Sequence, residues 1–247
     1  SSASGAEAAG VVSIGHAAFF GVGAYAAALA GKNWGIPAEA AFLLAGCASA
    51  ILAALFYWPT IRLSGHTVGL ATLAIGQIVY LVSLNWVGFT RGPMGIPGVA
   101  RPSLLLGGID MNSLSAQYWQ ALAVLALVVT IAFGLLNSPI GRTWRAIRED
   151  RLAAHASGIP VPRYLTLVFL VSGFLVGLAG AQFAFLQNFV SPDSFMIDTS
   201  IVLISMIVLG GLGNITGAQA GGALLAMLPE VLRDFAEYRM VAYGSSL

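Results

Sequence analysis

Long runs of apolar residues, separated by short polar segments, occupy most of this chain. Each run approaches the about 20 apolar residues that a helix needs to cross a bilayer. The pattern predicts helices over residues 11–30, 37–58, 66–86, 118–136 and 164–186. A sixth apolar run breaks at Gly210–Gly213, which fits either two half-helices or two short helices joined by a loop, and we favour the latter. The fold class expected is all-α, a polytopic transmembrane helix bundle.

The composition excludes an ordinary soluble domain. Hydrophobic residues make up 58% of the chain and charged residues 9%, whereas about a quarter of the residues of soluble domains are charged. The apolar runs continue along the whole length, which also excludes a secretory signal followed by a soluble body. We expect one transmembrane domain over residues 1–247. The small, Ala-rich start and the stop at Leu247 indicate truncation at both ends.

Basic residues are concentrated in one stretch, although the net charge is only +1. Five of the 11 Lys and Arg residues are Arg142, Arg145, Arg148, Arg151 and Arg163. Because loops rich in Arg stay in the cytoplasm, we place residues 138–163 there. Contact with anionic head groups is a second interpretation of these arginines. Alternation then places residues 59–65 inside and residues 87–117 and 187–199 outside.

The Arg-rich stretch has the pattern of a short amphipathic helix, a turn and a return to the membrane. Trp144, Ile147 and Leu152 alternate with charged groups at roughly helical spacing. Gly158 supplies a helix stop, and the prolines after it prevent continuation. A rigid projection of this kind suits a groove on a partner, and an ordinary cytoplasmic loop is the alternative.

The sequence contains no recognisable catalytic constellation. The three histidines are far apart, which argues against a metal site. The only lysine is Lys32, so there is no phosphate-binding loop with its lysine. We interpret the single cysteine, Cys47, as a small buried residue. An ion-coupled secondary transporter would need acidic residues within the membrane, and the sequence has few. If transport uses ATP, another chain must bind it.

Six blocks in order along the chain resemble the LivM-type branched-chain amino-acid permeases of ABC importers. The blocks cover residues 13–25, 70–78, 90–96, 138–150, 191–195 and 208–213. In addition, Glu149–Ala154 with Gly158 resembles the EAA coupling loop that contacts the ATPase subunits of ABC importers. This loop, within residues 138–163, is expected to form the coupling helix.

The resemblance implies a permease subunit in a bacterial inner membrane that performs no chemistry itself and holds no cofactor. Its partners would be a homologous second permease subunit, two cytoplasmic ATPase subunits that bind ATP and magnesium, and a periplasmic substrate-binding protein, with no nucleic acid. Branched-chain amino acids are the leading substrate. Urea, short amides or other amino acids are alternatives, because Gln77 and Met94 stand where relatives often carry Glu and Asn.

The resemblance also implies roles for particular residues. Residues expected to couple to the ATPase are Arg145, Arg148, Glu149, Asp150, Ala153, Ala154 and Gly158. Residues expected to meet the binding protein are Arg91, Gly92, Pro93, Gly95, Ser191, Pro192 and Asp193. Because a zwitterionic substrate needs a few polar groups along an apolar path, His16, Thr72, Gln77 and Asn85 are candidates for the path. Helix–helix hydrogen bonding is the alternative for His16 and Gln77.

Overall fold

The computed structural model describes residues 16–60, 66–99 and 113–195, together with residues 205, 217, 219–224 and 227. The chain divides into two units, residues 1–200 and 201–247. In the second unit residues 219–224 are helical. The break predicted at Gly210–Gly213 lies outside the described residues, so both interpretations of the sixth apolar run stay open. The paragraphs that follow concern the first unit.

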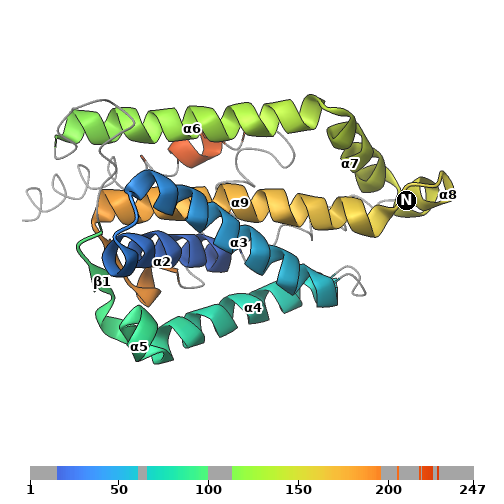
Figure 1. The fold of residues 1–247 in the computed structure, drawn as a ribbon. Helices are drawn as coiled ribbons and strands as arrows, with labels where there is room; N and C mark the ends of the chain where they lie inside the picture. The colour runs from blue at the N-terminus through green and yellow to red at the C-terminus, as the bar shows by residue number, and fades with distance from the viewer. Residues whose placement is uncertain are drawn as a thin grey trace, which may run out of the picture. The chain divides into compact units, whose positions relative to one another are not determined.

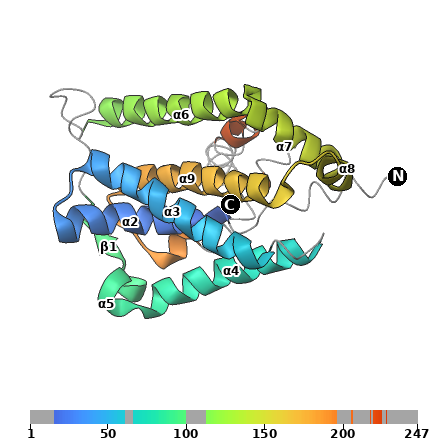
Figure 2. The same cartoon turned by 45° about the vertical axis from the view of Figure 1, so that its right-hand side comes forward.

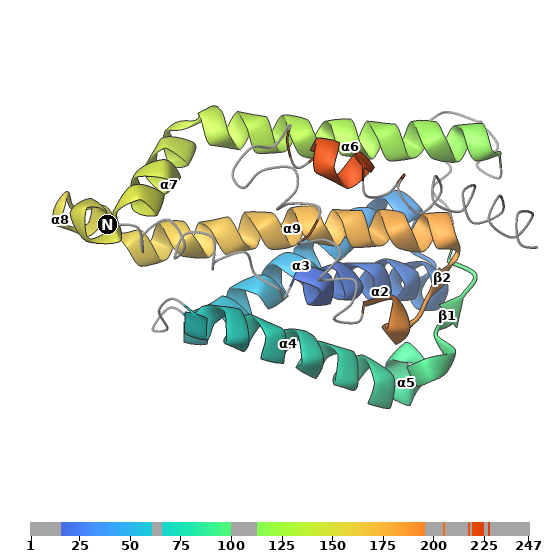
Figure 3. The ribbon, with the colours of Figure 1, turned by 180° about the vertical axis from the view of Figure 1, so that it is seen from behind.

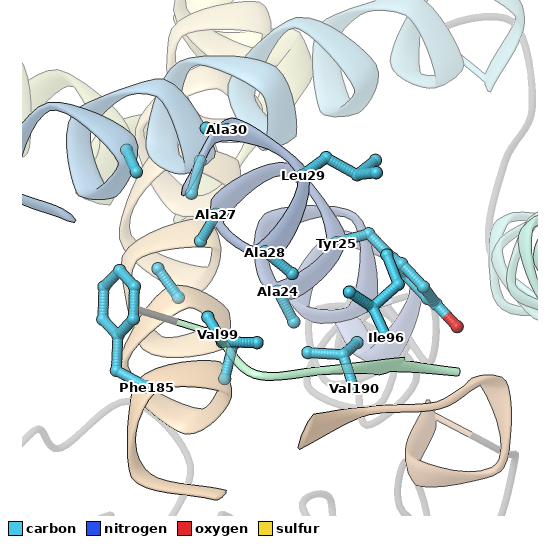
Figure 4. Close-up of a cluster of buried hydrophobic side chains, with 14 of the residues drawn as sticks. Ala24, Tyr25, Ala27, Ala28, Leu29, Ala30, Ile96, Val99, Phe185 and Val190 are labelled. Carbon is cyan, nitrogen blue, oxygen red and sulfur yellow. The ribbon is translucent and has the colours of Figure 1, made fainter. Parts of the chain in front are cut away.

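Three helices form the core: α2 (His16–Trp34), α3 (Ala38–Thr60) and α9 (Val161–Gln187). Figure 1 shows α2 and α3 against α9. Eleven of the 19 residues of α2 are buried, which makes it the central helix. Its buried surface is rich in alanine, as Figure 4 shows for Ala24, Ala27, Ala28 and Ala30. Small side chains let helix backbones approach closely in a membrane, where apolar burial alone gives little driving force.

Glycines make the closest contacts between these helices. A Cβ atom added at Gly23 would lie 2.6 Å from the Cα atom of Gly177, and one added at Gly177 would lie 2.6 Å from the Cβ atom of Ser49. The buried Ser49 hydroxyl donates a hydrogen bond of 2.6 Å to the Phe19 carbonyl. The core therefore depends on small residues where α2, α3 and α9 meet.

The helix α4 (His66–Asn85) ends in a bend of 74° that leads into α5 (Val87–Thr90) and the 3-10 helix η1 (Gly92–Met94). The buried Thr90 hydroxyl fixes this bend. It lies 2.6 Å from the Ser83 carbonyl and 2.8 Å from the Trp86 carbonyl, and it accepts a bond of 3.2 Å from the Gly92 N–H. The expectation of an irregular loop over residues 87–117 is therefore wrong for Val87–Met94.

A small structure that we call the cap covers one end of the core. It consists of η1, β1 (Ile96–Pro97), β2 (Phe189–Val190) and the 3-10 helix η2 (Pro192–Phe195). The two strands pair antiparallel, with Ile96 opposite Val190. Figure 3 shows β1 and β2 side by side. The Ile96 and Val190 side chains are both buried in the core cluster. Lys32 Nζ donates to the Pro97 carbonyl at 3.0 Å, which ties the end of α2 to the cap.

Two short helices, α7 (Pro139–Glu149) and α8 (Arg151–Ala156), join α6 (Leu114–Asn137) to α9. Figure 2 shows them at the far end of α6 and α9 from the cap. At the start of α6 the Ser113 hydroxyl accepts a bond from the Ala116 N–H. Only 6% of the apolar window of α6 is buried, so packing against the other described helices covers little of its apolar surface.

Among the described residues, three helices are long and apolar enough to cross a membrane: Ala38–Phe56, Leu114–Asn137 and Val161–Gln187. The bent pair Ala71–Asn85 and Val87–Met94 makes a fourth if it is one span. The central helix α2 is not among them. The chain is therefore a multi-pass, helical membrane protein, as predicted.

The interpretation of Cys47 as a buried residue is wrong. Its side chain is exposed, and it lies on α3 between Leu43 and Ile51, which are 60% and 67% exposed. These positions are four residues apart and form one apolar stripe along the helix. The stripe is exposed in this chain, which suits contact with lipid tails.

All five predicted helices exist, but several ends differ from the prediction. The polar residues after Ala30 continue α2 to Trp34, and α3 continues through Pro59. Ser113 is the N-cap residue of α6, so this helix begins at Leu114, four residues before Tyr118. The helix α9 begins at Val161 rather than Tyr164, because Pro162 is tolerated in a first turn, where its missing N–H has no intrahelical partner.

Candidate functional site

The segment between α6 and α9, residues 138–163, is called the connector here. Its first helix, α7, is fastened to the end of α6. Arg145 Nη2 donates to the Leu136 carbonyl at 2.5 Å, and the Ser138 hydroxyl accepts from the Gly141 N–H at 3.3 Å. Gly141 packs so tightly that an added Cβ atom would lie 2.5 Å from the Leu135 carbonyl oxygen. The angle between α6 and α7 is therefore fixed by several contacts.

The same helix is also fastened to α9. Trp144 Nε1 donates to the Tyr164 carbonyl at 3.0 Å. Ile147, Ala154 and Val161, one from each of α7, α8 and α9, form a small buried cluster. The connector is thus a rigid bracket that joins two long helices.

Polar caps delimit α8 at both ends. Asp150 Oδ1 accepts bonds from the N–H groups of Leu152 and Ala153 at 2.8 and 3.0 Å, which is the usual role of an N-cap aspartate. After the helix, Gly158 has φ +81°, and the Ile159 N–H reaches back to the Ala154 carbonyl at 3.1 Å. This is a Schellman motif, and it confirms the helix stop predicted at Gly158.

The predicted coupling residues divide into those that face outward and those that hold the connector together, and of the seven only Ala154 is buried. Arg148, Glu149 and Ala153 are exposed. Ala154 is buried, Asp150 and Gly158 hold the ends of α8, and Arg145, although exposed, is used on α6. The sequence analysis assigns no coupling role to Leu152, whose side chain is 84% exposed on α8. A leucine beside arginines in a short helix could have indicated an exposed contact residue.

The residues predicted to meet a binding protein divide in the same way. The structure brings the two segments together, since β1 pairs with β2. Arg91, Pro93 and Asp193 are exposed. The remaining four are buried parts of the cap: Gly92, Gly95, Ser191 and Pro192. Gly95 needs its glycine, because its φ is +66° and an added Cβ atom would lie 2.9 Å from the Phe189 ring.

The residues predicted for the path do not share one face of the bundle. Thr72 is buried and Gln77 is half-buried, and at about 100° per residue they lie roughly 140° apart around α4. Asn85 is exposed and its Nδ2 donates to the Leu81 carbonyl of the same helix at 2.8 Å, so the expectation that it points inward is wrong. His16, half-buried, is the first residue of α2.

Among the buried polar residues that the sequence analysis does not name are Tyr25, Gln120 and Gln182. Gln120 Nε2 donates to Gln182 Oε1 at 3.4 Å and joins α6 to α9. The Tyr25 hydroxyl and Gln182 Nε2 are buried with no hydrogen-bond partner among the described residues. Such a group costs about 1–3 kcal/mol. All three are polar residues within apolar runs, a pattern that the sequence analysis uses only over residues 66–86.

In the described part of the chain, no three or more His, Cys, Asp or Glu side chains lie close enough together to hold a metal ion. The bundle is instead built to span a membrane. It has a rigid bracket at one end of α9 and a cap at the other, about 40 Å away for a 27-residue helix. This arrangement defines a membrane protein whose two ends are specialised differently.

The chain belongs to the family described as the permease component of branched-chain amino acid transport systems, whose model matches residues 6–245. It is 34% identical over 95% of its length to the high-affinity branched-chain amino acid transport system permease protein LivM of Salmonella typhimurium, of which the match covers 60%. It is 31% identical, with the same coverage of both chains, to the LivM protein of Escherichia coli.

A second, more distant group of relatives carries the name LivH. The chain is 27% identical over 88% of its length to the LivH permease of Salmonella typhimurium, of which 75% is covered. The chain thus spans 60% of the length of the LivM relatives and more of the LivH relative. No solved structure matches it. The LivM-type resemblance predicted from the six blocks is confirmed.

Proposed function

We propose that this chain is the membrane-spanning permease subunit of an ABC importer that carries branched-chain amino acids across a bacterial inner membrane. The observation that carries the proposal is the family match over residues 6–245. The names of the LivM relatives support the substrate. A urea, short-amide or other amino-acid permease of the same family is the alternative.

We also propose that the connector is the surface that meets the ATPase subunits on the cytoplasmic side. Arg148, Glu149, Leu152 and Ala153 are the exposed groups that would make the contact. The rigid attachment of α7 to α6 and α9 supports this role, because a push on α8 would move both long helices rather than bend the connector. ATP and magnesium would be bound by the ATPase partners.

At the opposite end, the exposed groups of the cap would meet a substrate-binding protein. Arg91, Pro93 and Asp193 are the predicted residues that remain available. A homologous second permease subunit would complete the pathway, in keeping with the two named types of relative, LivM and LivH.

The experiment is ATP-dependent uptake of radiolabelled leucine into proteoliposomes that hold the whole importer and its binding protein. The test variant is Leu152→Arg, because Leu152 is 84% exposed and contributes nothing to the buried cluster. Burying a leucine is worth about 1.5–3 kcal/mol, so loss of the contact lowers uptake by roughly tenfold or more. The control is Leu114→Arg, since Leu114 is 86% exposed at the start of α6.

The outcomes separate the parts of the proposal. Saturable leucine uptake that Leu152→Arg reduces and Leu114→Arg does not supports both substrate and coupling surface. Uptake of urea or an amide in place of leucine changes the substrate only. Uptake that needs no ATPase subunit overturns the importer and favours an ion-coupled transporter. Gly158→Trp is a weaker test, because a side chain at φ +81° strains α8 itself.

A further inference from the structure

Tyr25 lies where α2 meets the cap, in a group of aromatic rings from three elements. The Phe195 ring of η2 lies 6.0 Å from the Tyr25 ring, 5.7 Å from that of Phe20 and 6.2 Å from that of Phe183. Tyr25 is only 6% exposed, and Figure 4 shows its hydroxyl directed away from the alanine surface of α2. A phenylalanine would pack against these rings equally well.

The hydroxyl group is the unexplained feature of this position. It is fully buried and has no hydrogen-bond partner among the described residues. Buried polar groups without partners are few in folded proteins, and each calls for an explanation. An unpaired buried hydroxyl lowers the stability of the fold, so phenylalanine would be more stable here. We therefore look for a state of the transport cycle in which the hydroxyl does form a hydrogen bond.

The element that packs against Tyr25 also carries a carboxylate. Asp193 is on η2, two residues before Phe195, whose ring centroid lies 6.0 Å from that of Tyr25. Asp193 is exposed whereas Phe195 is buried, so η2 carries a charge at its surface and an apolar ring beneath it. A negative charge, a hydroxyl and an aromatic surface are therefore carried by elements that pack together.

We propose that Tyr25 and Asp193 bind the ammonium group of the transported amino acid, while the rings of Phe20, Phe183 and Phe195 receive its aliphatic side chain. This deepens the proposed function and rests on it. The hydroxyl oxygen accepts a hydrogen bond from the ammonium group, and the carboxylate neutralises its charge. In the present structure the rings contact one another, so the site is closed, and a shift of η2 away from α2 opens it.

The test changes one functional group at a time in the complete permease–ATPase complex in lipid nanodiscs. The binding protein is left out, because its own affinity would mask the effect. Binding is followed as the rise of the thermal unfolding midpoint with ligand concentration. The probes are leucine, 3-methylbutylamine, which lacks the carboxylate, and 4-methylpentanoate, which lacks the ammonium group. The variants are Tyr25→Phe and Asp193→Asn, with Tyr164→Phe at the other end of α9 as the matched control.

We expect leucine and the amine to stabilise the wild type and 4-methylpentanoate to have no effect. Tyr25→Phe and Asp193→Asn each shift the leucine dependence to about tenfold higher concentration, the effect of one charge-assisted hydrogen bond, and Tyr164→Phe shifts nothing. An unchanged leucine dependence in Tyr25→Phe overturns the inference, as does stabilisation by 4-methylpentanoate equal to that by leucine or no stabilisation by leucine at all.

Uptake of leucine by the wild-type importer, with its binding protein, is measured on the same preparation. Its absence contradicts the proposed function, whereas its presence with unaltered ligand dependence in Tyr25→Phe contradicts only this inference. A Tyr25→Phe variant that loses stability without a change in ligand dependence assigns the hydroxyl a structural role and likewise overturns the inference.

Discussion

Gly177 lies where all three core helices meet, so the packing of the core depends on its lack of a side chain. It faces Gly23 of α2 and Ser49 of α3, and an added Cβ atom would lie 2.6 to 2.7 Å from Ser49 and Ala45 atoms. These contacts include backbone, which cannot rotate away as a long side chain can. Overpacking of this kind typically costs about 1–3 kcal/mol.

We therefore expect Gly177→Ala to lower the thermal unfolding midpoint of the purified permease. Gly134→Ala is the matched control, because Gly134 is also inside a long helix but has no atom within 4 Å of an added Cβ. There alanine gains about 0.5–1 kcal/mol of helix propensity, so the midpoint rises slightly. Equal shifts in the two variants would show that close packing at Gly177 does not limit stability.

Residue roles were predicted well where the backbone conformation decides them and poorly where distant contacts do. Gly158 was recognised because a helix stop is a local property. The burial of Ala154, by contrast, depends on Ile147 and Val161 from two other helices. No local pattern reports that contact, so a small residue in a charged stretch reads as surface.

At the scale of elements, the hydrogen bonds that attach the connector to α6 and α9 should transmit force from the ATPase subunits to these helices. Trp144→Phe removes the indole N–H that bonds the Tyr164 carbonyl, and Arg145→Lys removes the guanidinium that reaches the Leu136 carbonyl. Each hydrogen bond is worth about 0.5–1.5 kcal/mol. We expect each variant to lower the leucine carried per ATP hydrolysed by roughly threefold, while the rate of ATP hydrolysis stays close to that of the wild type.

The control for these variants is Arg142→Gln, which changes the charge of an exposed residue on the same helix. The ratio of leucine uptake to phosphate release, measured on one proteoliposome preparation, reports coupling separately from assembly. If Arg142→Gln lowers the ratio as much as Trp144→Phe does, the net charge of the connector matters more than its rigid attachment.

The long helices were predictable because an apolar run of about 20 residues admits few other structures in a membrane. Their ends were not predictable, since helix-capping residues such as Ser113 lie in polar segments that also resemble loops. The cap, made of η1, β1, β2 and η2, is the part of the fold that the sequence predicts least well. Its strands have two residues each and pair across more than ninety positions of sequence, which no periodicity can reveal.

At the scale of the molecule, the fold separates two differently built ends by one long helix. Because α9 joins the connector directly to the cap, the two ends must lie on opposite sides if α9 crosses the membrane. The Arg-rich connector then belongs in the cytoplasm by the positive-inside rule, and the cap lies outside. This orientation is an expectation that labelling can test.

Two matched positions make the test direct, since Leu152 of α8 and Met94 of η1 are each 84% exposed. Cys47, the one cysteine of this chain, is first replaced by serine because it is exposed. We expect a membrane-impermeant thiol reagent to label Met94→Cys in cells whose outer membrane is permeabilised, and Leu152→Cys only in inside-out vesicles. Labelling of both from one side would mean that α9 does not cross, and the connector could not then meet ATPases while the cap meets a binding protein.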